Sequence, residues 1–252
     1  MSRLIDNFII MVSSSVLLLQ MVLCLSAYAI TTENYVLSDS PNPDFEKFGE
    51  YSNAILRSSI FLALSGRISK EDKRYPTLTE VLKLMVDRNS YTLIEAGTAR
   101  EGEGSCAGDG CSTPIFAHFS YLTGRNFISV DISEKNCEKS RQAIRPYADN
   151  SKVIKSDSIA FLKEFRDPID FLYLDSVDYD FKNPKVSQEH SLKEIKAAYG
   201  KLHEHSIILL DDCTLPGGGK CKLAAEFLLK NGWEKLIDSY QMVFIHTESI
   251  IW

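Results

Sequence analysis

The chain has 252 residues, of which 44% are hydrophobic, and its formal net charge is −6. This length predicts one α/β domain with a short N-terminal extension, and the apolar fraction suffices for a packed core. The acidic balance and the lack of a long basic run exclude a nucleic-acid-binding surface, because phosphate recognition needs clustered Lys and Arg.

The N-terminus carries an uncharged, largely apolar segment over residues 8–29, preceded by Arg3. The Ala-Tyr-Ala triplet at residues 27–29 has the small-x-small form of a signal-peptidase site. Residues 1–30 are therefore predicted to be a cleaved signal peptide or a membrane anchor, since the segment is long enough to span a bilayer. The acidic residues that follow place the rest of the chain on the outer side of the membrane.

The next region is polar and contains prolines, and apolar residues at helical spacing follow, which predicts a linker and a helix over residues 31–76. The remaining chain, residues 77–252, is predicted to be one domain. It begins with a helix over residues 77–88, which Thr77 or Thr79 would cap.

Residues 91–131 predict a strand, a glycine-rich loop, a helix and a second strand. An apolar run ends at Glu95, a loop with five glycines follows, Ser112 and Thr113 open the helical pattern, and another apolar run ends at Asp131. Glycines allow close approach to a ligand, a helix N-terminus offers free N–H groups, and an acid at the next strand tip can accept both hydroxyl protons of a ribose. The unit predicts a site for a nucleoside-containing cofactor. Because the glycines do not follow G-x-G-x-x-G, a dinucleotide is not the first expectation.

Strands and helices alternate through the rest of the chain, which predicts a parallel sheet with helices on both faces. The predicted helices cover residues 133–145, 158–165, 187–202 and 220–231, and the predicted strands cover residues 153–155, 171–174, 206–210, 233–237 and 241–246. The last two strands are expected to pair antiparallel. The fold class is therefore Rossmann-like α/β, a doubly wound and mostly parallel sheet with a C-terminal antiparallel strand.

Asp175, Asp211 and Asp212 follow two apolar strands that are predicted to be neighbours. Converging carboxylates raise one another's pKa values unless a cation lies among them. Oxygen-only ligation suits Mg²⁺, and ligands bind at the carboxyl edge of open α/β sheets. The three aspartates therefore predict a magnesium site. The alternative is that Asp212 only caps the turn that follows it.

His190 is the candidate general base for removing a proton from an acceptor hydroxyl, since histidine titrates near neutral pH. The alternative is a capping or surface histidine. A bound magnesium ion would align the acceptor oxygen and lower its pKa, so Asp175 joins His190 as a predicted catalytic residue.

Several motifs at strand ends resemble those of class I S-adenosylmethionine-dependent methyltransferases. They are Glu95-Ala96-Gly97-Thr98-Ala99-Arg100, Gly108-Asp109-Gly110-Cys111-Ser112-Thr113, Asp131, Asp157-Ser158, Leu172-Tyr173-Leu174-Asp175 and Leu209-Leu210-Asp211-Asp212. Within this family the chain is similar to magnesium-dependent O-methyltransferases of small molecules and sugars, and to cephalosporin-hydroxylase-like proteins. The resemblance implies S-adenosylmethionine and Mg²⁺ as cofactors and O-methyl transfer to a hydroxyl as the reaction.

The resemblance also implies roles for individual residues. The cofactor would contact the loop residues Gly97, Thr98, Gly110, Ser112 and Thr113. Glu95 would orient the methionine part of the cofactor or hold the loop, Asp131 would bind the ribose or serve as a turn residue, and Asp157 with Ser158 would meet the adenine. An N-cap is the equal alternative for Asp157. Asp178 stands where catechol-type relatives carry a lysine base, so that base and a catechol substrate are not expected.

An exported domain conflicts with a cofactor that is made in the cytosol, and a later start or a reversed orientation would keep the chain cytoplasmic. Export would allow bridges Cys106–Cys111 and Cys213–Cys221, with Cys137 left over, whereas a cytosolic chain would keep thiols. The alternative function is an exported or membrane-tethered binding module without catalysis, and another metal-dependent reaction is a third. The expected partner is a small-molecule or sugar acceptor, with membrane association and oligomerisation left open.

Overall fold

The computed structural model describes residues 57–246, which belong to the compact unit Gly49–Trp252. The predicted signal peptide or anchor over residues 1–30 and the linker after it lie outside the described residues. Within residues 57–246, none of the helices combines the length and the apolarity that crossing a bilayer requires.

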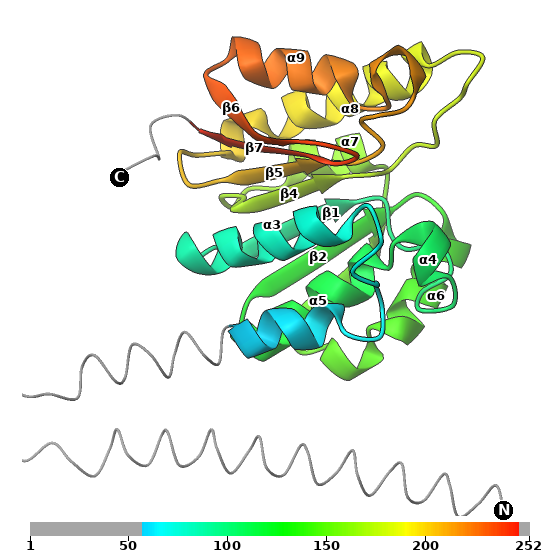
Figure 1. Ribbon diagram of the computed structural model, residues 1–252, viewed down its shortest axis with the longest axis vertical. Coiled ribbons are helices and arrows are strands. Elements are labelled where there is room, and N and C mark those ends of the chain that lie inside the picture. The colour runs from blue at the N-terminus through cyan, green and yellow to red at the C-terminus, as the bar shows by residue number, and fades with distance from the viewer. Residues whose placement is uncertain (1–56, 247–252) are drawn as a thin grey trace, which may run out of the picture. The chain divides into compact units, whose positions relative to one another are not determined.

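A seven-stranded sheet with the order β3-β2-β1-β4-β5-β7-β6 forms the centre of the fold (Figure 1). Its strands are β1 Thr92–Ala96, β2 Asn126–Asp131, β3 Ser151–Lys155, β4 Phe171–Leu174, β5 Ile207–Leu210, β6 Trp233–Asp238 and β7 Met242–His246. The first five strands pair in parallel, and β7 pairs antiparallel with both β5 and β6. The predicted fold class, a doubly wound and mostly parallel sheet with a C-terminal antiparallel strand, is confirmed.

Helices cover both faces of the sheet. One face packs against α3 Tyr75–Asp87, α5 Ser112–Thr123 and α6 Glu134–Ala143, and the other packs against α7 Ser158–Glu164, α8 Lys185–Ala198 and α9 Lys222–Lys230. Successive strand residues point to opposite faces. Leu93 and Phe171 accordingly lie in one apolar cluster, and Ile94 and Leu172 lie in the other. Because the central strands β1, β4 and β5 are buried on both faces, they appear in the sequence as mainly apolar runs.

The start of α3 differs from the prediction. The helix begins at Tyr75, and Pro76 lies in its first turn, where a fixed φ is favourable and no backbone N–H is needed. Thr77 is therefore buried inside the helix, and the hydroxyl of Thr79 donates to the carbonyl of Tyr75 at 2.8 Å, so neither threonine is the cap. Ser133, by contrast, caps α6 as predicted, because its side chain accepts a backbone N–H of the first turn.

Two helical segments complete the layer that contains α3 and α5. Residues 57–64 are helical, and Ile60, Ala63 and Leu64 pack into the same apolar cluster as α3. The short helix α4, Cys106–Asp109, lies within the glycine-rich loop and was not predicted. A single helical turn shows no apolar periodicity, so the sequence pattern did not reveal it.

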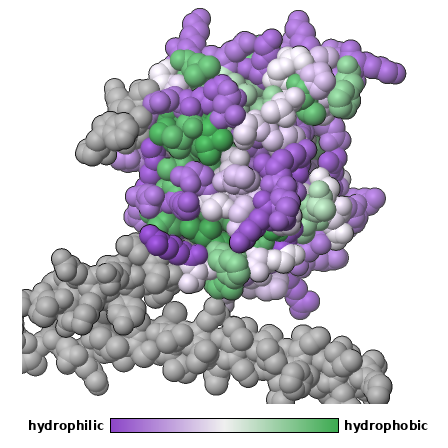
Figure 2. Space-filling view, viewed as in Figure 1, coloured by the Kyte–Doolittle hydropathy of each residue, from purple (hydrophilic) through white to green (hydrophobic). Residues whose placement is uncertain are grey.

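The surface agrees with the charged composition of the chain. Figure 2 shows hydrophilic residues over most of the face drawn there, with smaller hydrophobic areas between them. Exposed large hydrophobic side chains in the described part of the chain include Phe61, Tyr121 and Phe181. Scattered exposure of this kind is normal for a folded domain and indicates no particular partner.

Candidate cofactor cavity and acidic centre

The strand order of the sheet reverses between β1 and β4. The chain runs outward from β1 through β2 to β3 and then returns to β4 and β5. The strand ends are aligned, because the N–H of Gly97 donates to the carbonyl of Val130 and the N–H of Asp175 donates to the carbonyl of Ala96, each at 2.8 Å. In open α/β sheets this carboxyl edge, at the reversal, is where ligands bind.

A cavity of about 160 Å³ opens at this edge. Its walls come from the loop after β1, the start of α5, the tip of β2 and the loop after β4. Four of the predicted site residues line it: Thr98, Ser112, Asp131 and Asp175. One cavity therefore connects three of the predicted cofactor residues with Asp175, one of the three predicted metal ligands.

Asp131 turns toward the glycine-rich loop. Its Oδ2 accepts the backbone N–H of Thr98 at 3.2 Å, and its Oδ1 accepts the backbone N–H of Ser133 at 2.7 Å. The amide of Asn136 lies 3.5 Å from Oδ2. One carboxylate oxygen thus holds the turn after β2, which was the alternative role, while the other faces the loop that borders the cavity.

Gly97 is required by the protein's own backbone. Its φ is +93°, and a Cβ at this position would lie 2.3 Å from the carbonyl oxygen of Asp175. Only glycine permits such an approach at positive φ. Gly110, with φ +83°, turns the chain at the end of α4, where a Cβ would lie 3.1 Å from the side chain of Arg74. Neither glycine is among the residues that line the cavity.

Glu95 is fully buried under the loop after β1. Its Oε2 accepts the hydroxyls of Thr113 at 2.6 Å and Ser129 at 2.5 Å. Burial raises the pKa of Glu95 to about 7, although these hydroxyl hydrogen bonds lower it. The hydroxyl oxygen of Thr113 also accepts the N–H of Ala99 at 2.8 Å. Glu95 and Thr113 therefore hold the loop from below, and they do not line the cavity.

Asp157 and Ser158 face other parts of the protein. Asp157 caps α7, with its Oδ1 accepting the N–H of Ala160 at 2.8 Å. The hydroxyl of Ser158 donates to Glu194 at 2.5 Å and lies 3.4 Å from Nε2 of His190. Neither residue lines the cavity, so the structure supplies the capping role for Asp157 and gives no contact that supports an adenine site.

His190 lies in the second turn of α8, whereas the sequence placed it at the start of that helix. Its Nε2 is 3.3 Å from Oε1 of Glu194, and this hydrogen bond raises the pKa of His190. A second, much smaller cavity borders His190, Asp175 and Lys220 together. The histidine is therefore near the acidic centre, and the carboxylate of Glu194 stabilises its charged imidazolium form.

Asp175, Asp211 and Asp212 converge at the adjacent ends of β4 and β5. Each offers one carboxylate oxygen, and these oxygens lie within 4.8 Å of one another. The hydroxyl of Tyr173 donates to Asp211 at 3.0 Å and lies 3.4 Å from Asp175. Asp212 has a φ of +56°, a left-handed conformation that aspartate tolerates better than most residues. We call these three residues the acidic centre.

Two buried cations that the sequence analysis did not assign lie within the acidic centre. The ammonium of Lys220 contacts Asp175 and lies 3.4 Å from Oδ2 of Asp212. The Nε of Arg74 lies 3.5 Å from Oδ2 of Asp211. Lys220 is 4% exposed and Arg74 is 8% exposed. The run of glycines before Lys220 was a usable signal for a built loop, whereas no spacing in the sequence connects Arg74 to these acids.

The pKa shifts reflect this charge pattern. Burial raises the pKa of Asp175 to about 7, although Lys220 lowers it, and the neighbouring carboxylate of Asp211 raises it further. Burial also acts to raise the pKa of Asp212, but Lys220 and a hydrogen bond from Tyr240 lower it below the usual range. Burial works against a charged lysine, yet the three carboxylates raise the pKa of Lys220. Lys220 is therefore an ammonium ion at neutral pH.

Arg100 joins the two loops that border the larger cavity. Its guanidinium donates to both carboxylate oxygens of Asp178, at 2.8 and 3.0 Å, and its Nε donates to Asp109 at 3.2 Å. Asp109 also accepts the backbone N–H of Arg100 at 2.6 Å. Asp178 thus acts as an ion-pair partner across the cavity wall.

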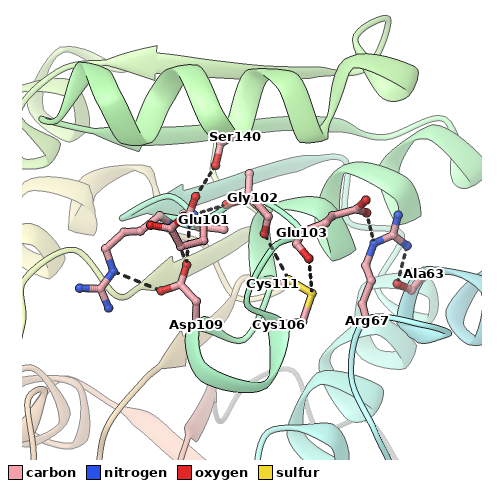
Figure 3. Close-up of a disulfide and its surroundings, with 12 residues drawn as sticks. Ala63, Arg67, Glu101, Gly102, Glu103, Cys106, Asp109, Cys111 and Ser140 are labelled. Atoms are coloured by element: carbon pink, nitrogen blue, oxygen red, sulfur yellow. Dashed lines mark hydrogen bonds and ion pairs between the residues drawn. A yellow bond between two sulfur atoms is a disulfide. The ribbon is translucent and has the colours of Figure 1, made fainter.

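A disulfide between Cys106 and Cys111 closes the glycine-rich loop around α4 (Figure 3). This is one of the two bridges expected for an exported chain. The other expected bridge, between Cys213 and Cys221, is not formed, because both residues are buried free thiols. Cys137 is also a buried free thiol. Asp109 lies between the two cysteines in the chain, so the bridge constrains a segment that contributes to the cavity wall.

Comparison with known proteins gives one family match and solved structures of similar fold. Residues 107–213 match the family described as methyltransferase domain. Among solved structures, the O-methyltransferase NovP has 12% sequence identity and a TM-score of 0.52, with 79% of this chain and 99% of that chain covered. SAH-bound PaMTH1 from Podospora anserina has 15% identity, 84% and 99% coverage, and a TM-score of 0.48. No curated protein matches the chain in sequence.

The match of residues 107–213 to the methyltransferase-domain family, together with the fold, supports the resemblance to class I S-adenosylmethionine-dependent methyltransferases. The resemblance to class I S-adenosylmethionine-dependent methyltransferases, which the sequence motifs indicated, is therefore confirmed. The likeness to NovP concerns the fold, because its sequence identity is low.

Proposed function

We propose that this chain transfers a methyl group from S-adenosylmethionine to a hydroxyl of a small molecule or sugar. The observation that carries the proposal is a single cavity lined by both Asp131 and Asp175. Asp131 belongs to the wall formed by the glycine-rich loop and β2, and Asp175 belongs to the acidic centre. A cofactor and an acceptor bound at these two ends would meet within one space.

The residues at the Asp131 end fit a nucleoside. The carboxylate of Asp131 is suited to accept ribose hydroxyls, and Ser112 opens α5, whose N-terminus offers backbone N–H groups. When bound, S-adenosylmethionine supplies a methyl group on a positively charged sulfur, which makes it a strong methyl donor. The chain's own task is then to hold the acceptor oxygen in line and to remove its proton.

At the other end, Asp175 is the residue best placed for the acceptor, since it borders both cavities. With a pKa of about 7, its carboxyl group can take up a proton near neutral pH. The base role of His190 remains a proposal. Magnesium dependence is supported only by the oxygen donor set of the acidic centre. The ammonium of Lys220 opposes it, because that cation already lies among the carboxylates.

Calorimetric titration with S-adenosylmethionine and S-adenosylhomocysteine tests the proposal. Asp131→Ala is expected to weaken binding by about 10- to 100-fold, because hydrogen bonds to a charged group contribute about 1.5–3 kcal/mol. Asp149→Ala, at an exposed position, is the matched control. No binding by the wild-type chain, or equal binding by Asp131→Ala, contradicts the cofactor assignment. A screen of hydroxylated small molecules and sugars for a mass gain of one methylene then identifies the acceptor.

The Cys106–Cys111 disulfide favours a second candidate, an exported or membrane-tethered binding module that has lost catalysis. Disulfides persist mainly in oxidising compartments. Mass spectrometry of the native protein would show the state of the N-terminus and of the cysteines. A processed or membrane-bound chain with this bridge intact and no affinity for S-adenosylmethionine supports the binding module, and a cytoplasmic chain with reduced cysteines contradicts it.

A further inference from the structure

We propose that the ammonium of Lys220 is the resident cation of the acidic centre, and that this centre works without a divalent metal ion. The inference deepens the proposed function, because it rests on that function for placing the acceptor at Asp175. The identity of the cation, however, is a property of the protein alone and is testable without cofactor or acceptor.

The charges within the centre are largely compensated by the protein itself. Lys220 contacts Asp175 and approaches Asp212, and Arg74 approaches Asp211. Two positive groups therefore face three carboxylates. The sequence argument for magnesium assumed that no such cations were present, and without that assumption the repulsion between the carboxylates no longer requires a metal ion.

The geometry also disagrees with a magnesium ion. Mg²⁺ requires nearly octahedral oxygen ligands at about 2.0–2.1 Å. An ion shared by Asp175 and Asp212 would have to occupy the space where the Lys220 ammonium already bridges these two side chains. Among the described residues, Oδ1 of Asp211 accepts no hydrogen bond, so one oxygen retains capacity for a further ligand. With the Lys220 ammonium in place between Asp175 and Asp212, the residues do not fit Mg²⁺.

The loop that carries Lys220 is built to hold it there. The N–H of Lys220 donates to the carbonyl of Asp212 at 3.1 Å, and its own carbonyl accepts the hydroxyl of Ser191 at 3.2 Å. Gly219 has a φ of +72°, and a Cβ there would lie 2.4 Å from the carbonyl of Asp212. The side chain of Gln188 donates to the carbonyl of Gly219 at 2.9 Å. Contacts on both sides therefore fix the backbone that directs the lysine inward.

Because they are buried, the lysine and the carboxylates of the acidic centre each need the opposite charge of the other. A charged lysine that is 4% exposed is unfavourable without an anionic partner, and the buried carboxylate of Asp211, at 1% exposure, is unfavourable without a cation. Removal of the lysine charge would leave three close carboxylates with vacated space between them. Such a centre should recruit a divalent ion, which gives the proposal a positive test.

The test uses the full-length chain and Mn²⁺ as a spectroscopic probe for a hard divalent ion. Mn²⁺ binding is measured by electron paramagnetic resonance for the wild type, Lys220→Met and the control Lys222→Met, which alters an exposed lysine nearby. We expect no binding below millimolar Mn²⁺ for the wild type and the control, and at least about 10-fold tighter binding for Lys220→Met. Adding Asp175→Asn to Lys220→Met should abolish the gain.

Micromolar Mn²⁺ binding by the wild-type chain that Asp175→Asn removes overturns the proposal, as does a folded Lys220→Met variant that binds no better than the wild type. If Lys220→Met fails to fold, the Lys220→Arg variant is measured instead. A folded arginine variant that binds no Mn²⁺ supports a resident cation. An arginine variant that binds Mn²⁺ contradicts the proposal. None of these measurements contains S-adenosylmethionine. A failure of cofactor binding would therefore remove the proposed function and leave the result for Lys220 standing.

Discussion

Glu95→Gln is the substitution whose effect on stability the structure predicts with a magnitude. The carboxyl group of Glu95 is fully buried, and burial raises its pKa from 4.5 to about 7. A raised pKa means that the folded state favours the protonated form. This contribution to stability is fully present below the unfolded pKa and is lost as the pH rises through the folded pKa.

Between about pH 5 and about pH 8, this linkage amounts to a loss of about 2.5 kcal/mol in the free energy of unfolding of the wild type, since one pKa unit corresponds to about 1.4 kcal/mol. Glutamine preserves the shape and the hydrogen-bonding capacity but does not ionise. The difference in stability between Glu95→Gln and the wild type should therefore shift by about that amount in favour of glutamine as the pH rises.

Urea unfolding at both pH values measures the effect, and the difference between the two proteins cancels the titration of all other groups. The exposed Glu138→Gln variant serves as the control for the loss of one carboxylate on the surface. A stability difference that stays constant between the two pH values would show that Glu95 is ionised in the folded state, and the account of the buried carboxyl group would be wrong.

Two further predictions concern the glycine-rich loop. Gly97→Ala should destabilise the chain by about 3 kcal/mol or more and remove cofactor binding, because the new methyl group would meet the backbone of Asp175 at positive φ. Gly124→Ala has a similar φ with nothing within 4 Å, so urea unfolding should show a loss of only about 1 kcal/mol. Replacing Cys106 and Cys111 with serine should lower stability by about 2 kcal/mol, as the entropy of this short loop indicates. A melting temperature that neither this replacement nor a reductant changes would contradict the last prediction.

Much of the fold could be read from local patterns. The strand predicted over residues 171–174 is β4, Phe171–Leu174, and the runs that end near Glu95 and Asp131 are β1 and β2. Strands buried on both faces have no polar alternation, and an acid that ends such a run marks the strand tip. The acids at the edge of the sheet were therefore predictable in position, as was the convergence of the aspartates at the ends of β4 and β5.

The sequence by itself determined the order of the strands and helices along the chain and the acids at the strand ends, because these follow from short-range periodicity. Only the tertiary structure decided which cations balance the negative charge of those acids. The three aspartates have the same positions in the sequence whether a metal ion or an ammonium group lies among their side chains. Lys220 and Arg74 reach the acidic centre from separate loops, and charge balance depends on neighbours in space that no local spacing encodes.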